Sequence, residues 1–74
     1  MYKTTDLYEI TYILLYCRVQ AIEMTGKKLT YVFADEARTY AREFWEGVPK
    51  VNIRQYVNLL RSTKNYIFNR LRTG

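Results

Sequence analysis

The chain has 74 residues, of which 49 % are hydrophobic, and its formal net charge at pH 7 is +5. This length limits it to one domain, near the size at which a single core gives only marginal stability, and the apolar content excludes a disordered segment. There is no histidine and one cysteine, Cys17, so the commonest catalytic base is missing and no intramolecular disulfide can form. We interpret Cys17 as a small buried hydrophobe. We therefore predict a non-enzymatic protein that has no catalytic residue, binds no metal and needs no cofactor.

Nothing in the sequence indicates a membrane or an exported location. The longest apolar stretch, ITYILLYC, is well below the ~18 apolar residues of a membrane span. The N-terminal stretch MYKTTDL also lacks the pattern of a signal peptide. We therefore expect a cytoplasmic protein with no membrane partner.

The first element in chain order is a helix predicted over about residues 6–17. Asp6 is a suitable N-cap, and Glu9 three residues later gives the spacing of a capping box. This helix is apolar on nearly all sides, so it is either central to a core or covered by a second partner. We predict that the protein is a homodimer, because tyrosine is favoured at interfaces. The predicted interface is the helix face that carries Tyr8, Tyr12, Leu15 and Tyr16.

A β-hairpin is predicted next, over about residues 18–34. Two stretches rich in β-branched and aromatic residues flank the turn Thr25-Gly26-Lys27-Lys28, where Gly26 can take the positive φ of a type II′ turn. One face of the second strand carries Leu29, Tyr31 and Phe33. A lone two-stranded ribbon is marginal in water, so we expect it to lie on helices or to pair with a second copy.

Two helices follow, predicted over about residues 36–46 and 53–72. Asp35 is the expected N-cap of the first helix, Gly47 ends it, and Pro49 prevents its continuation. The apolar stripe of the first helix is Ala37, Tyr40, Ala41 and Phe44.

The last helix has Asn52 as its expected N-cap. Its predicted apolar stripe is Ile53, Tyr56, Val57, Leu60, Ile67 and Leu71. The order of elements predicts a single α+β domain over residues 1–74, in which a two-stranded antiparallel hairpin packs with three helices. We expect each element to give the core one buried residue, namely Leu14, Phe33, Phe44 and Leu60.

Three stretches carry a resemblance to a known family: TTDLYEITYIL, YVFAD and FWEGVPKVNIRQYVNLLRSTKNYIF. Together with the order of elements, they resemble a small bacterial and phage-associated family known only as a domain of unknown function. The family has no established catalytic residues. The resemblance implies a stable helix–hairpin–helix–helix unit and a phage or mobile-element setting. The tyrosine-rich first helix and the acid-free C-terminal part depart from the family pattern.

Charge is unevenly distributed along the chain. Residues 1–46 have a net charge of −1, whereas residues 47–74 contain six basic side chains and no acidic one. On the last helix, Arg54, Arg61 and Arg72 fall within about 20° of one azimuth. Such a face suits a polyanion, and we predict a nucleic acid, with DNA favoured. The predicted contacts are Arg54, Asn58, Arg61, Lys64, Asn65 and Arg72, together with Lys27 and Lys28 at the hairpin tip.

Two other interpretations of this basic helix stay open. It is the solvated face of a core helix, with the last cations placed to suit the helix dipole. Alternatively, it docks on an acidic protein, as expected of an adaptor or inhibitor of phage or mobile-element origin. A helix-turn-helix is only weakly indicated, because the turn that contains Pro49 is longer than usual.

Overall fold

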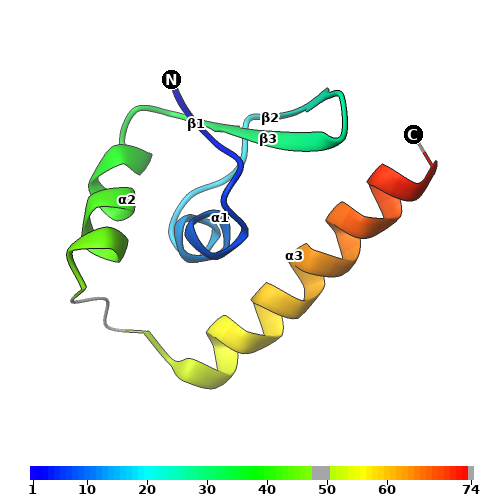
Figure 1. The fold of residues 1–74 in the computed structure, drawn as a ribbon. Helices are drawn as coiled ribbons and strands as arrows, with labels where there is room; N and C mark the ends of the chain where they lie inside the picture. Colours follow the sequence, from blue (N-terminus) through cyan, green and yellow to red (C-terminus); the bar gives the residue numbers. More distant parts are fainter. Residues whose placement is uncertain (48–50, 74) are drawn as a thin grey trace.

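The computed structural model describes residues 1–47 and 51–73, and Pro49 lies outside this range. The α+β class and the order helix, hairpin, helix, helix are confirmed (Figure 1). The sheet has three strands where two were predicted. The elements are β1 (Tyr2–Thr4), α1 (Leu7–Leu14), β2 (Ala21–Thr25), β3 (Lys28–Phe33), α2 (Ala37–Glu46) and α3 (Ile53–Thr73).

The unpredicted strand is β1, which pairs with β3 and makes β3 the central strand of a β1-β3-β2 antiparallel sheet. Tyr2 lies opposite Phe33, and Thr4 lies opposite Tyr31. A three-residue strand is too short for an alternating pattern to reveal it. Its pairing covers the free edge of β3, so the hairpin gains a third strand from its own chain.

The hairpin turn follows the prediction. Thr25 pairs with Lys28 across a two-residue turn, and Gly26 has φ 62°. No residue other than glycine has positive φ in the part of the chain that the structure describes. Lys27 therefore has negative φ, which fits type II′ and excludes type I′.

Helix α1 begins as predicted and ends earlier. The Asp6 carboxylate accepts a hydrogen bond from the Glu9 amide at 2.9 Å, which confirms the N-cap. The helix stops at Leu14 rather than near Cys17, because the Leu15 and Tyr16 amides donate to the carbonyls three residues before them, those of Tyr12 and Ile13, and so form a tighter 3₁₀-type turn.

The caps of the other helices are confirmed except for one. Gly47 ends α2 with φ 82°, and the Asn52 side chain accepts from the Gln55 amide at 3.0 Å at the start of α3. Asp35 is not the N-cap of α2; Glu36 has that position and makes no side-chain capping bond. The Asp35 carboxylate instead binds the N-terminal ammonium group at 2.6 Å, an ion pair that local sequence rules do not reveal.

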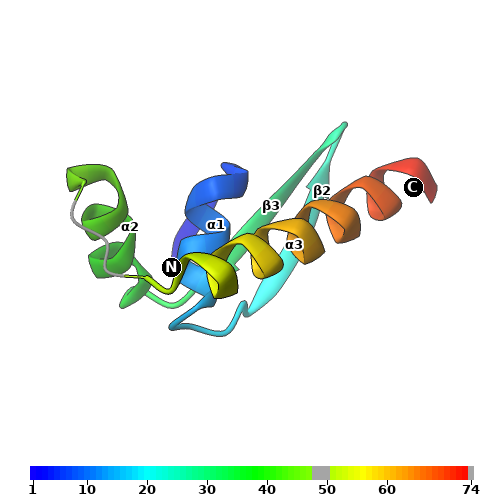
Figure 2. The ribbon, with the colours of Figure 1, turned by 90° about the horizontal axis from the view of Figure 1, so that it is seen from below.

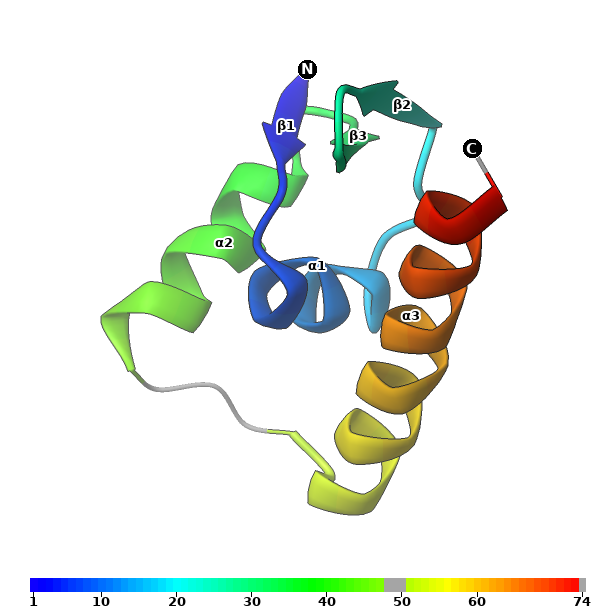
Figure 3. The same ribbon diagram turned by 45° about the vertical axis from the view of Figure 1, so that its right-hand side comes forward.

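Helix α1 lies in the middle of the fold, with the sheet on one side and α2 and α3 on two others (Figures 1 and 3). Seen from below, α3 runs past α1 and the hairpin, and α2 lies on the other side of α1 (Figure 2). The buried core cluster consists of Ile10, Ile13, Leu29, Tyr31, Phe33, Ala37 and Ala41.

The predicted core is only partly correct. Phe33 is fully buried, whereas Leu14, Phe44 and Leu60 are half-buried. The predicted stripe of α3 is wrong at its start, because Ile53 is 76 % exposed and Val57 is 40 % exposed. The reason is length: α3 extends for about 31 Å and α1 for about 12 Å, so α1 cannot cover the whole inner side of α3. None of the described helices is both long and apolar enough to cross a bilayer.

Candidate nucleic-acid interface

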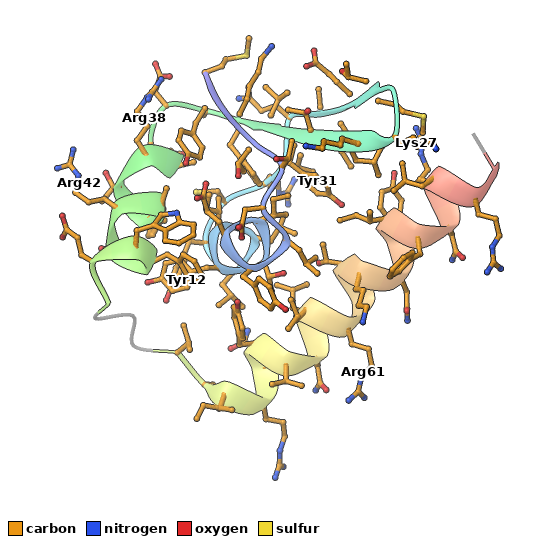
Figure 4. The ribbon with its side chains drawn as sticks, in the orientation of Figure 1. Tyr12, Lys27, Tyr31, Arg38, Arg42 and Arg61 are labelled. Atoms are coloured by element: carbon orange, nitrogen blue, oxygen red, sulfur yellow. The ribbon has the colours of Figure 1, made fainter. Side chains whose placement is uncertain are left out.

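The outer side of α3 is formed by the residues that the helix cannot pack against its own fold. Tyr56, Thr63 and Ile67 lie on the inner side, and Thr63 is buried. At 3.6 residues per turn, Arg61, Asn65 and Arg72 fall on the opposite side, whereas Lys64 lies at the border of the inner side. Figure 4 shows Arg61 pointing away from α1 and the sheet. The structure places all the predicted α3 contacts at exposed positions: Arg54, Asn58, Arg61, Lys64, Asn65 and Arg72.

The arginines of this outer side form no ion pair with an acidic side chain in the part of the chain that the structure describes. The Asp35 carboxylate is shared by the N-terminal ammonium and Arg38, and Lys3 pairs with Glu23 at 3.4 Å. These ion pairs lie around the sheet and α2. Among the described residues, no carboxylate lies within ion-pair distance of the three arginines that the sequence singled out, Arg54, Arg61 and Arg72.

The fold brings the hairpin tip to the C-terminal end of α3. Lys27 and Arg72, which are far apart in sequence, line the same groove of about 670 Å³ between β2 and α3. Figure 4 shows Lys27 at the tip of the hairpin, beside the last turns of α3. Lys28 lines a neighbouring groove, on the side where α1 begins, and Asp6 lines it too. Lys27 lines this second groove as well, so it borders both Arg72 on α3 and the side that carries Asp6, whereas Lys28 lies on the side of Asp6.

The N-terminal half of α3 has a groove of its own. Arg54 and Asn58 line it together with Leu14 and Leu15 from the end of α1, and its volume is about 590 Å³. The predicted contacts thus divide into two groups. Arg54 and Asn58 border the cleft between the two helices, whereas the later residues follow the outer side toward the hairpin tip.

Two aromatic residues on α3 were missed at the sequence level. Phe68 is 60 % exposed and Tyr66 is 42 % exposed. The Lys64 ammonium lies 5.9 Å from the centre of the Phe68 ring, and the Arg70 guanidinium lies 6.0 Å from that of Tyr66. The position of Phe68 could have been predicted from helical periodicity, because Phe68 follows Arg61 by seven residues and therefore shares its side of the helix.

The predicted dimer face of α1 is largely used within the chain. Tyr12 is only 2 % exposed, its ring packs on Phe44 of α2, and its hydroxyl donates to the Glu43 carboxylate at 3.0 Å. Tyr12 is therefore not available to a second copy, and its place in the predicted interface is corrected. Tyr16 is 47 % exposed and stacks on Tyr40 of α2 with ring centres 4.6 Å apart. Helix α2 supplies the cover for which we had expected a second copy.

Three residues of the predicted dimer face keep a surface that a partner can reach: Tyr8, Leu15 and the outer part of Tyr16. Tyr8 is 56 % exposed, and its carbonyl accepts from the Tyr56 hydroxyl. Leu15 is half-buried at the mouth of the α1–α3 cleft.

The buried carboxylate of Glu9 has a structural role, because its hydrogen bonds join three elements of the fold. It is 4 % exposed and accepts hydrogen bonds from the Tyr2 hydroxyl and the Trp45 indole N–H, so it joins β1, α1 and α2.

Burial raises the pKa of the half-buried Cys17 thiol, which lowers its thiolate fraction and its reactivity. Within the described ranges, acidic and cysteine side chains form no group of three that could hold a metal ion.

Comparison of the chain with protein-family models, with curated proteins and with solved structures gives no match. The resemblance to the phage-associated family stays a prediction.

Proposed function

We propose that this protein binds nucleic acid through the outer side of α3 and the adjoining hairpin tip. The observation that supports this most directly is a helix of 21 residues on which Arg54, Arg61 and Arg72 have no acidic partner in the described part of the fold. Ordinary solvated helices mix charges of both signs, because pairs of opposite sign three or four residues apart stabilise the helix. Helix α3 contains no Asp or Glu, so it lacks these stabilising pairs along its whole length, as expected of a surface that binds a polyanion.

The expected chemistry is binding of phosphates. Arg61 and Arg72 lie roughly 16 Å apart along the helix, and Lys27 joins Arg72 at the groove by the hairpin. Each cation that neutralises a phosphate releases a condensed counterion, which gives affinity that falls steeply as salt increases. Asn65 on the same side can bond phosphate oxygens or base edges. Binding needs no metal or cofactor in this scheme.

Nuclear magnetic resonance tests the location of the interface. Titration of isotope-labelled protein with a mixed-sequence oligonucleotide at low salt should shift amide resonances along the outer side of α3 and at Gly26 and Lys27. Resonances of α2 around Arg42 should stay in place and serve as the internal control. Absence of any shift at low salt, or shifts centred on α2, would contradict the proposal.

A second candidate function is docking on an acidic protein. The observation that favours it is the exposed apolar surface at the start of α3, where Ile53 and Val57 lie beside Arg54. Exposed apolar residues framed by cations are typical of a protein interface. This candidate predicts that Ile53→Ala weakens binding of the partner and that the protein ignores random oligonucleotides, whereas phosphate binding is insensitive to that change.

A further inference from the structure

We propose that the α3 site takes an unpaired, single-stranded segment of nucleic acid, on which the Phe68 ring acts as a stacking platform. This inference rests on the proposed function and adds the class of nucleic acid. It starts from an exposed aromatic side chain that the fold does not need, because Phe68 is 60 % exposed and lies outside the core cluster.

Phe68 lies in line with the cations. The residues Arg61, Asn65, Phe68 and Arg72 are spaced by four, three and four positions, which places them along one side of a helix. The aromatic ring therefore stands between two arginines, with an asparagine one turn before it. Positive residues that follow a backbone, interleaved with a ring for the bases, are the arrangement by which proteins hold single strands.

The surroundings of the ring also suit a nucleotide. Phe68 lines the groove at the hairpin tip together with Met24, Lys27 and Arg72, so an apolar patch and two cations meet at one place. The Lys64 ammonium lies 5.9 Å from the ring centre. If a base stacks on this ring, the phosphates of its nucleotide lie within reach of Lys27, Lys64 and Arg72. Figure 4 shows Lys27 at the hairpin tip, next to this end of α3.

Duplex binding explains this position less well. In a duplex the bases stack on each other, and a protein reaches phosphates and most base edges through hydrogen-bonding groups, while an apolar side chain contacts mainly the thymine methyl group. A phenylalanine ring has no such group, so it contributes nothing to phosphate contacts at the centre of a cation row. An unpaired base has a free face, and stacking on it is tolerant of sequence.

Fluorescence anisotropy with labelled oligothymidylate, oligouridylate and a mixed-sequence duplex of equal length provides the test. Wild type should bind at least one of the single strands more tightly than the duplex at low salt. Phe68→Ala should weaken single-strand binding by roughly 5- to 150-fold, the range expected for loss of one stacked base, and should change duplex binding far less. Phe68→Trp should retain binding, whereas Phe68→Leu, which keeps apolar bulk without a ring, should not. Ile53→Ala, an exposed apolar change at the other end of α3, is the matched control and should have no effect.

The outcomes separate this inference from the function on which it rests. No binding of any oligonucleotide at low salt overturns the proposed function itself. Binding that is equal for single strand and duplex, or unchanged in Phe68→Ala, leaves phosphate binding in place and overturns the single-strand inference. Equal losses in Phe68→Leu and Phe68→Trp would likewise exclude stacking. Because Phe68 is exposed, circular dichroism should show the same melting temperature for every variant.

Discussion

Replacing single tyrosine hydroxyls tests whether the buried Glu9 carboxylate holds β1, α1 and α2 together. Three tyrosines donate to different acceptors: Tyr2 to the buried Glu9 carboxylate, Tyr12 to the exposed Glu43 carboxylate and Tyr56 to the Tyr8 carbonyl. A Tyr→Phe change at each site removes one hydroxyl and keeps the ring, so Tyr2 and Tyr56 compare a buried with an exposed acceptor, while Tyr12 loses its bond to Tyr16 as well as the one to Glu43.

The expected losses differ because water reaches the three acceptors to different extents. A hydrogen bond to a charged group contributes about 1.5–3 kcal/mol, and a buried acceptor left without it cannot recover the loss from water. Glu9 is 4 % exposed, so Tyr2→Phe should cost about 2–3 kcal/mol. Glu43 is exposed and regains water, so Tyr12→Phe should cost about 1 kcal/mol. Tyr56→Phe, at an exposed bond, should stay within about 0.5 kcal/mol.

Thermal melts followed by circular dichroism measure these differences. In a domain of this size a loss of 1 kcal/mol lowers the melting temperature by roughly 4–8 °C, so Tyr2→Phe should melt roughly 10–20 °C below wild type. Tyr56→Phe should be nearly indistinguishable from wild type. Equal shifts in the Tyr2 and Tyr56 variants would refute the role assigned to Glu9, because that role depends on the burial of the acceptor.

Three further predictions concern pH, the core and self-association. Burial and the bond to Glu9 raise the pKa of Tyr2 to about 12, which favours its neutral form in the folded state. The free energy of unfolding should therefore hold up to about pH 10 and fall between pH 10 and 12. Urea melts should show a shallower fall with pH in Tyr2→Phe than in wild type, and identical pH profiles of the two proteins would contradict this. Phe33→Ala should cost about 3–5 kcal/mol and the half-buried Leu60→Ala distinctly less, and a reversed order in denaturant melts would mean that the core is misplaced. Self-association through Tyr8 and the exposed start of α3 predicts a dimer in sedimentation at micromolar concentration, and a monomer at every concentration would exclude it.

The sequence was most informative where structure depends on neighbouring residues. Asp6, Gly26, Gly47 and Asn52 were assigned from local capping and turn chemistry, and the structure has each of them in that role. The polar side of α3 followed from helical periodicity in the same way. These features need only a few consecutive residues, which is why sequence alone was enough for them.

The features that the sequence did not predict correctly depend on contacts between segments that are far apart in the chain. The strand Tyr2–Thr4 exists because β3 offers it an edge, and Asp35 leaves its capping role for the N-terminal ammonium. The apolar second face of α1 correctly indicated a covering partner, but sequence could not tell α2 from a second copy, so Tyr12 was misplaced. The groove that joins Lys27, Phe68 and Arg72 likewise depends on how the hairpin meets α3.

The most direct test of the central claim compares the loss of one arginine from each of two helices. Arg61 on α3 and Arg42 on α2 are both exposed, and Figure 4 shows them on opposite sides of the molecule. Oligonucleotide binding measured by fluorescence anisotropy over a salt series should weaken in Arg61→Ala, with the slope of log affinity against log salt reduced by about one unit, and should stay nearly unchanged in Arg42→Ala. Equal effects of the two changes, or no binding by wild type at low salt, would contradict a nucleic-acid interface on α3.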